Sequence, residues 1–180
     1  MLAEIAALPL QLDTAFAGEL FLLGRLLFGG VLAFMGLNHF MDLDTMAGYA
    51  EFKGLPAPRF SVVASGVLLV LGGIGIVVGA YPVIAAGGLA IFLLVSAVTM
   101  HDFWSIDDPE DKHSEMTSFL KNLYGAGAAI ALLAVGGTAW PYGLGIGLLE
   151  AAPTHRTRAD QSYFSNPLSR AISRKACRLR

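Results

Sequence analysis

Arg25 is the residue whose type and position in this sequence suggest chemistry most directly. It lies inside the apolar stretch 18–37, and a charged side chain at the middle of a membrane-spanning helix costs about 2.5–3.5 kcal/mol. Glu19, the nearest carboxylate, is six positions away on a different face of the helix. Arg25 therefore either presents its guanidinium to a carbonyl, a quinone or an anionic headgroup in a pocket, or extends toward the membrane surface and backbone carbonyls.

Two histidines and a tryptophan form a second group of candidates. His39 and His101 end the first and third apolar stretches, which run in the same direction, so both are expected at one membrane surface. With the neighbouring Asp42 and Asp102 they could shuttle protons or hydrogen-bond a quinone, or they could simply cap helix ends. Trp104 is expected at the same level, either as an interfacial anchor or as a surface on which a quinone stacks.

The histidine spacing matches no specific metal signature, so we expect neither a metal ligand nor a catalytic residue. The predicted cofactor-binding residues are Arg25, His39, His101 and Trp104.

Composition indicates the class of protein that carries these residues. The chain has 180 residues, of which 55% are hydrophobic and 14% are charged, whereas soluble domains carry about 25% charged residues. These values predict an integral membrane protein and exclude a nucleic-acid-binding domain, a secreted disulfide scaffold and a soluble enzyme with its own large core. The single cysteine, Cys177, excludes chemistry that needs two thiols in one chain.

The apolar pattern predicts an all-α fold with four transmembrane helices in a bundle. The uncharged run 61–100 is divided at Pro82, because proline favours a turn over one very long helix. The four spans are expected at about 18–37, 61–80, 82–100 and 122–142. Between the first two, residues 42–54 predict a short helix on the membrane surface. Its apolar face would consist of Leu43, Met46, Ala47 and Ala50.

The charge distribution predicts how the chain is divided and oriented. Seven of the 12 Lys and Arg residues follow Thr154 and should stay in the cytoplasm. An even number of spans then places both termini inside a plasma membrane and the two long loops outside. We expect an N-terminal interfacial segment (1–17), a transmembrane domain (18–150) and a basic tail (151–180). The tail could bind anionic lipid headgroups or another subunit.

Six short motifs resemble the DoxX/DoxD-like family of small four-span membrane proteins, in order and in spacing. They are Gly24–Gly30, Gly36–Phe40, Gly54–Pro58, Leu71–Gly73, His101–Trp104 and Lys121–Asn122. Many members have an acidic residue in the second span, where this chain has Ser65-Gly66-Val67-Leu68. This departure removes a partner for Arg25. The family takes its name from a subunit of a thiosulfate:quinone oxidoreductase, and its distant relatives include chaperones and cargo receptors.

The resemblance favours an accessory subunit of a quinone-linked respiratory complex. The position of Arg25 inside a predicted span adds the expectation of a lipid or quinone pocket near it. The alternative is a non-catalytic assembly factor or scaffold for a partner protein. In either case we expect no enzyme activity from the chain alone and no intrinsic cofactor, with a quinone or a bound lipid as candidate ligands. The expected partners are membrane lipids and other membrane subunits or a second copy of the chain, and not nucleic acid.

Overall fold

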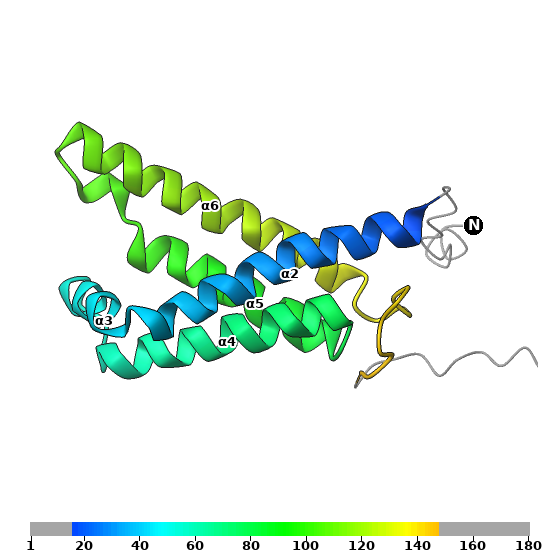
Figure 1. The fold of residues 1–180 in the computed structure, drawn as a ribbon. Helices are drawn as coiled ribbons and strands as arrows, with labels where there is room; N and C mark the ends of the chain where they lie inside the picture. Colours follow the sequence, from blue (N-terminus) through cyan, green and yellow to red (C-terminus); the bar gives the residue numbers. More distant parts are fainter. Residues whose placement is uncertain (1–15, 148–180) are drawn as a thin grey trace, which may run out of the picture. The chain divides into compact units, whose positions relative to one another are not determined.

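Helices form nearly all the regular structure of residues 16–147, which are the residues described in this computed structural model (Figure 1). They belong to one compact unit of the chain, Met1–Glu150. The elements are α2 (Ala17–Met41), α3 (Leu43–Phe52), α4 (Pro58–Val78), α5 (Pro82–Met100), the short 3-10 helix η1 (Phe103–Ser105) and α6 (Pro109–Ala134). The predicted segment 1–17, apart from its last two residues, and the basic tail 151–180 lie outside the described residues.

Prolines and a glycine set the helix boundaries. Pro58, Pro82 and Pro109 each lie in the first turn of a helix, where the missing backbone N–H of proline removes no hydrogen bond. Gly79 ends α4 in the left-handed region, with φ of 68°. The predicted division of the long apolar run at Pro82 is therefore confirmed: α4 and α5 are separate helices joined by a tight turn.

Among residues 16–147, three helices, α2, α4 and α5, are long and apolar enough to cross a membrane. They correspond to the first three predicted spans. The helix over the fourth predicted segment differs from expectation at both ends. It begins at Pro109 instead of near residue 122, and it ends at Ala134 instead of near residue 142.

The early start of α6 has a local cause. The side chain of Asp108 accepts hydrogen bonds from the backbone N–H groups of Glu110 and Asp111, which caps the helix in the charged part of the sequence. No helix-breaking residue follows, so the charged turns continue directly into the apolar half. As a result only the second half of α6 resembles a span.

The short helix predicted between the first two spans is α3. Ala47 and Ala50 on its predicted apolar face are 6% and 1% exposed, and Leu43 and Met46 are half-buried. The face packs mainly on α4, so α3 is fixed to the body of the protein. Gly54 follows with φ of 76° and donates its N–H to the carbonyl of Glu51, which terminates the helix as predicted.

Small residues allow α2 and α4 to pack closely, and the two helices run side by side (Figure 1). A Cβ atom at Gly29 would lie 2.5 Å from the carbonyl oxygen of Gly73, and one at Gly36 would lie 2.8 Å from that of Gly66. In each helix the two glycines are seven positions apart, so both contacts fall on one antiparallel seam. Close backbone packing therefore explains these glycines.

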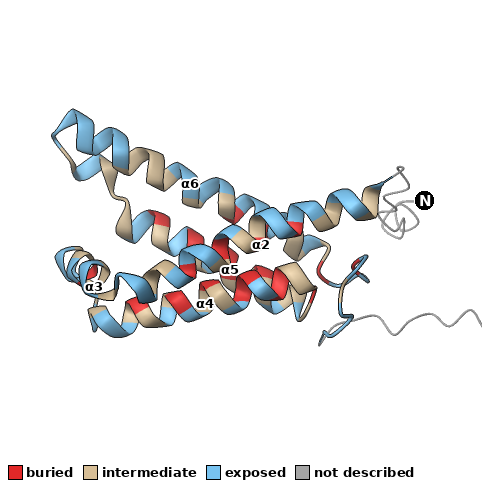
Figure 2. Ribbon diagram, viewed as in Figure 1, coloured by how far each residue is buried: buried red, intermediate tan, exposed pale blue. Residues whose placement is uncertain are grey.

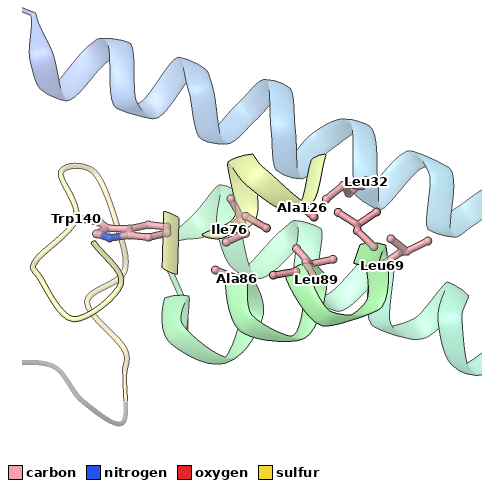
Figure 3. Close-up of a cluster of buried hydrophobic side chains, with 10 residues drawn as sticks. Leu32, Leu69, Ile76, Ala86, Leu89, Ala126 and Trp140 are labelled. Atoms are coloured by element: carbon pink, nitrogen blue, oxygen red, sulfur yellow. The ribbon is translucent and has the colours of Figure 1, made fainter. Parts of the chain in front are cut away.

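The hydrophobic core lies where α4 and α5 meet and extends to α2 and α6 (Figure 2). Leu69 and Ile76 of α4 and Leu89 of α5 are 2%, 0% and 0% exposed. Trp140, which follows α6, lies at one end of the cluster with its ring directed toward Ile76 (Figure 3). The core therefore continues to the end of the bundle at which α4 turns into α5.

Candidate functional site

Arg25 is completely buried near the beginning of α2, with an exposed fraction of 0%. Its guanidinium carbon lies 5.5 Å from the ring centroid of Phe21, one helical turn earlier, and 5.4 Å from that of Trp140. The two rings meet edge to face, with their centroids 5.1 Å apart. Aromatic faces stabilise a cation, and this explains how the charge is tolerated without exposure to lipid.

Residues 140–147, which we call the strap, cover this end of the bundle. Leu144 donates its backbone N–H to the carbonyl of Val78 at 2.9 Å, and Tyr81 donates to the carbonyl of Ile146 at 2.6 Å. The strap is thereby tied to the turn between α4 and α5. Trp140 is fixed separately, because its indole N–H donates to the carbonyl of Val135 at 2.9 Å.

Tyr142 in the strap connects Arg25 to Glu19 indirectly. The Nη2 atom of Arg25 donates to the backbone carbonyl of Tyr142 at 3.4 Å, a long hydrogen bond. The Tyr142 hydroxyl donates to Oε1 of Glu19 at 2.9 Å. The carboxylate thus holds the strap and makes no ion pair with the guanidinium. Within residues 16–147, the Nε and Nη1 atoms of Arg25 have no hydrogen-bond partner.

Two glycines make room for the guanidinium. A Cβ atom at Gly79 would lie 3.2 Å from Nη1 of Arg25 and 2.9 Å from the Cα atom of Gly143. A Cβ atom at Gly143 would lie 3.5 Å from the same nitrogen. A larger residue at Gly79 would therefore push against both the strap and the arginine, whereas at Gly143 the contact with the arginine would be an ordinary van der Waals contact. We call Arg25 and the four residues that enclose its guanidinium, Phe21, Gly79, Trp140 and Gly143, the Arg25 chamber.

A pocket of about 230 Å³ lies beside the Arg25 chamber and shares two of its walls, Gly79 and Trp140. Its other walls come from the start of α5, the end of α6 and the strap: Tyr81, Pro82, Val83, Ile84, Gly136, Thr138, Gly145, Ile146 and Gly147. Most of this surface is apolar. Arg25 itself is not among the residues that line this pocket.

The other predicted site residues lie at the opposite end of the bundle. Arg25 is close to the first residues of α5, whereas His101 follows its last residue, and 19 residues of helix span about 28 Å. His39, in the last turn of α2, hydrogen-bonds to the carbonyl of Met35 at 2.9 Å. Trp104 is 53% exposed and packs edge-on against Phe103. The structure therefore brings none of these three residues to Arg25.

His101 belongs to a separate polar network that joins α3 and α6. Its Nδ1 atom lies 2.8 Å from Oε2 of Glu115, whose Oε1 accepts a hydrogen bond from the Tyr49 hydroxyl at 2.9 Å. The same hydroxyl lies 3.0 Å from the carbonyl of Met100 at the end of α5. Burial raises the pKa of Tyr49, and the Glu115 carboxylate raises it further. The hydroxyl therefore stays protonated and acts as the donor.

We expect Tyr49→Phe to loosen the contact between α3 and α6, because it leaves the half-buried Glu115 without its hydroxyl donor. A hydrogen bond to a charged group contributes about 1.5–3 kcal/mol, and thermal unfolding in detergent measures the loss. Tyr124→Phe is the matched control, since Tyr124 is 70% exposed. Equal unfolding temperatures for the two variants would show that the network contributes nothing to stability.

We expect Gly79→Ala to displace the strap from Arg25. Gly54→Ala is the matched control. Both glycines have positive φ, 68° and 76°, so alanine at either position costs about 1–2 kcal/mol of backbone strain. Only at Gly79 would the new methyl group also meet the strap and Arg25; at Gly54 nothing lies within 4 Å. We expect hydrogen exchange at the Leu144 amide to accelerate in Gly79→Ala alone. Unchanged exchange there would contradict the described packing.

Sequence reasoning identified Arg25 but missed most of its surroundings. The position of Phe21 one turn before Arg25 was available as a signal, because residues four apart share a helix face. Gly79 follows the end of α4, and Tyr142 and Gly143 follow the end of α6. No periodic pattern in the sequence indicates that these residues fold back onto α2.

Comparison with known protein families identifies the first part of the chain. Residues 20–102 match the family model described as DoxX. This range contains α3, α4, α5 and nearly all of α2, with Arg25, His39 and His101, and it stops before Trp104 and α6. The resemblance expected from the motifs is confirmed. Comparisons with curated proteins and with solved structures find no match.

Proposed function

This chain is a DoxX-family membrane protein over residues 20–102, and we propose that it is a small accessory subunit of a quinone-linked membrane redox complex. It would offer a pocket for a quinone or a lipid, and it would supply no redox centre of its own. The enzyme activity would belong to its partner subunits.

The observation that carries this proposal is the buried guanidinium beside an apolar pocket. The Nε and Nη1 atoms of Arg25 have no hydrogen-bond partner among the described residues, and Gly79 and Trp140, which lie against Arg25, also line the pocket of about 230 Å³. A ligand with an acceptor oxygen and an apolar body would use both features. A quinone and a lipid have this form.

The proposal also includes a membrane arrangement. α2, α4 and α5 would be joined by the apolar second half of α6 as a fourth span, since α6 packs along α5. The charged first half of α6, together with α3 and η1, would then project from the outer surface of a plasma membrane. The termini and the turn between α4 and α5 would face the cytoplasm, as the basic residues after Thr154 predict.

The experiment that tests this function is gentle purification from native membranes, followed by mass spectrometry of co-eluting proteins and small molecules. We expect oxidoreductase subunits and a quinone or lipid to co-elute with the wild type. Arg25→Gln should reduce the recovery of the small molecule. Arg59→Gln is the control, because Arg59 pairs with Asp44 on the exposed surface at the other end. Recovery of the protein alone, or with partners unrelated to redox chemistry, would refute the proposal.

A scaffold or assembly factor is the second candidate, and the polar network of α3 and α6 supports it. Lys53 pairs with Asp102, and Tyr49 and Glu115 join the helices, so this end forms a fixed polar surface. Such a surface suits a protein partner. If this candidate is right, Glu115→Ala should release the co-eluting partner and Arg25→Gln should retain it.

A further inference from the structure

We infer that the strap and the first turns of α2, residues 17–24, form a surface that lies in the membrane, at the boundary between lipid headgroups and acyl chains. The partner of this surface is the lipid of the leaflet on the side assigned above to the cytoplasm. Three observations carry the inference: the extra length of α2, the lack of charge in the strap, and the exposed apolar side chains of both segments.

α2 extends past the turn between α4 and α5 (Figure 1). Gly29 faces Gly73 across the seam of these antiparallel helices, so Arg25, four residues earlier, lies level with Val77. Val77 is the next-to-last residue of α4, and residues 17–24 of α2 therefore continue about 12 Å beyond it. This projecting part of α2 cannot pack on α4.

The strap packs against the projecting part of α2 and adds no charge to it. A Cβ atom at Gly18 would lie 3.3 Å from the Cβ atom of Pro141, and residues 122–149 of the sequence contain no charged side chain. In the described part of this end, the exposed charge is that of Glu19, because Arg25 is completely buried. Soluble domains carry about 25% charged residues, so this composition favours lipid over water.

Large apolar side chains cover the outside of this end. Leu144 of the strap and Leu20 of α2 are each 63% exposed, and Leu23 is exposed as well. The exposed row continues along α2 to Leu27, within the predicted span. Residues three and four apart share one helix face, so acyl chains that contact Leu27 also reach Leu23 and Leu20. An exposed apolar surface marks a membrane or a protein contact, and continuity with a spanning helix favours the membrane.

Glu19 and Tyr142 mark the polar limit of this surface. The Tyr142 hydroxyl donates to Oε1 of Glu19 at 2.9 Å, and both residues are exposed. Tyrosine is enriched at the membrane–water boundary, where its ring contacts acyl chains and its hydroxyl contacts polar groups. Glu19 lies six residues, or about 9 Å, before Arg25 along α2. Segments that lie in the membrane interface reach about 5–10 Å into it, so the strap has a matching depth.

The backbone of the strap is suited to this depth. The N–H of Leu144 and the carbonyl of Ile146 are both paired with the turn between α4 and α5, and the carbonyl of Tyr142 accepts from Arg25. Non-helical backbone is tolerated within a membrane only where such pairing or a water-filled space satisfies its polar groups.

This placement also defines how a molecule reaches the pocket of about 230 Å³. Tyr81, Ile84 and Ile146 line the pocket and are themselves exposed. A ligand would then enter from the leaflet, and it would be a molecule dissolved in lipid and not in water. This consequence rests on the proposed function, whereas the position of the strap does not.

A spin label on the strap, in lipid nanodiscs, tests the placement. The label is attached to Leu144→Cys in a Cys177→Ser background, because the Leu144 side chain is exposed and the fold uses its backbone N–H. Power saturation measures collisions of the label with oxygen, which concentrates in lipid, and with a water-soluble nickel chelate. Ile91→Cys, in the middle of α5, is the control for lipid, and Ser114→Cys, in the charged half of α6, is the control for water.

We expect collisions with the nickel chelate to be at least about five-fold rarer for the Leu144→Cys label than for the Ser114→Cys label, because an apolar layer excludes a polar solute. Collisions with oxygen should be more frequent than for Ser114→Cys and approach those for Ile91→Cys. Frequent collisions with the chelate would place the strap in water and overturn the inference. Rare collisions with both reagents would show that a second copy or another segment covers the strap, which would also overturn it.

If Leu144→Cys disturbs the strap, a label on Ile146→Cys makes the same measurement two residues later. Neither variant requires a ligand or a partner subunit. A strap in water would therefore remove this inference while an oxidoreductase that co-elutes would still support the proposed function. A strap in the leaflet would support the inference even if no oxidoreductase co-elutes.

Discussion

Leucine in place of Gly29 is expected to separate α2 from α4 and to leave little folded protein, whereas leucine at the adjacent Gly30 should be tolerated. A Cβ at Gly29 would lie 2.5 Å from the carbonyl oxygen of Gly73 and 2.9 Å from a methyl carbon of Val77. Backbone cannot move aside as a flexible side chain can, so the cost should reach or exceed the upper end of the about 1–3 kcal/mol of overpacking. At Gly30 nothing lies within 4 Å.

Yield of monodisperse protein and unfolding temperature in detergent measure this difference. The paired substitution cancels any general effect of leucine on helix propensity or membrane insertion, because both positions lie next to each other in α2. Equal behaviour of the two variants would mean that α2 and α4 do not pack along the glycine seam.

Truncation of the Trp140 side chain is also expected to destabilise the folded protein strongly. Trp140 is 9% exposed, belongs to the core cluster and lies against both Phe21 and Arg25. Truncation of a buried tryptophan to alanine costs about 3–5 kcal/mol, and here it also removes one of the two aromatic faces that stabilise the guanidinium. We expect Trp140→Ala to lower the unfolding temperature strongly and to accelerate hydrogen exchange throughout the strap.

Trp140→Phe separates packing from the indole hydrogen bond. It retains an aromatic face but loses the N–H that donates to the carbonyl of Val135. We expect a smaller loss of stability than in Trp140→Ala. The described site would be contradicted if the alanine variant were as stable as the wild type.

Local sequence signals predicted the elements that depend on local interactions. The proline at position 82 divides α4 from α5, and the alanines of α3 form its buried face, because turn chemistry and helical periodicity operate within a few residues. Arg25 was identified because a charge in an apolar stretch is rare whatever the fold. The DoxX resemblance was confirmed over residues 20–102.

The same local signals could not predict contacts between residues that are far apart in the sequence. The strap reaches α2 from more than a hundred positions away, as the hydrogen bond from Arg25 to the Tyr142 carbonyl shows. Its residues have no periodic pattern that could indicate their partner. The start of α6 was also misjudged, since hydropathy places a helix where apolar residues begin, whereas the cap at Asp108 starts it in charged sequence. The Tyr49–Glu115 pair likewise joins residues that are 66 positions apart.

The most direct test of the central claim is an experimental structure of the full-length chain in nanodiscs that contain phospholipids and a quinone. The decisive observation is the density around the Nε and Nη1 atoms of Arg25. We predict that Arg25 lies against the rings of Phe21 and Trp140 beneath the strap, with non-protein density within hydrogen-bond distance of Nε or Nη1. An Arg25 side chain that extends out to the membrane surface, with the strap detached from α2, would contradict the site.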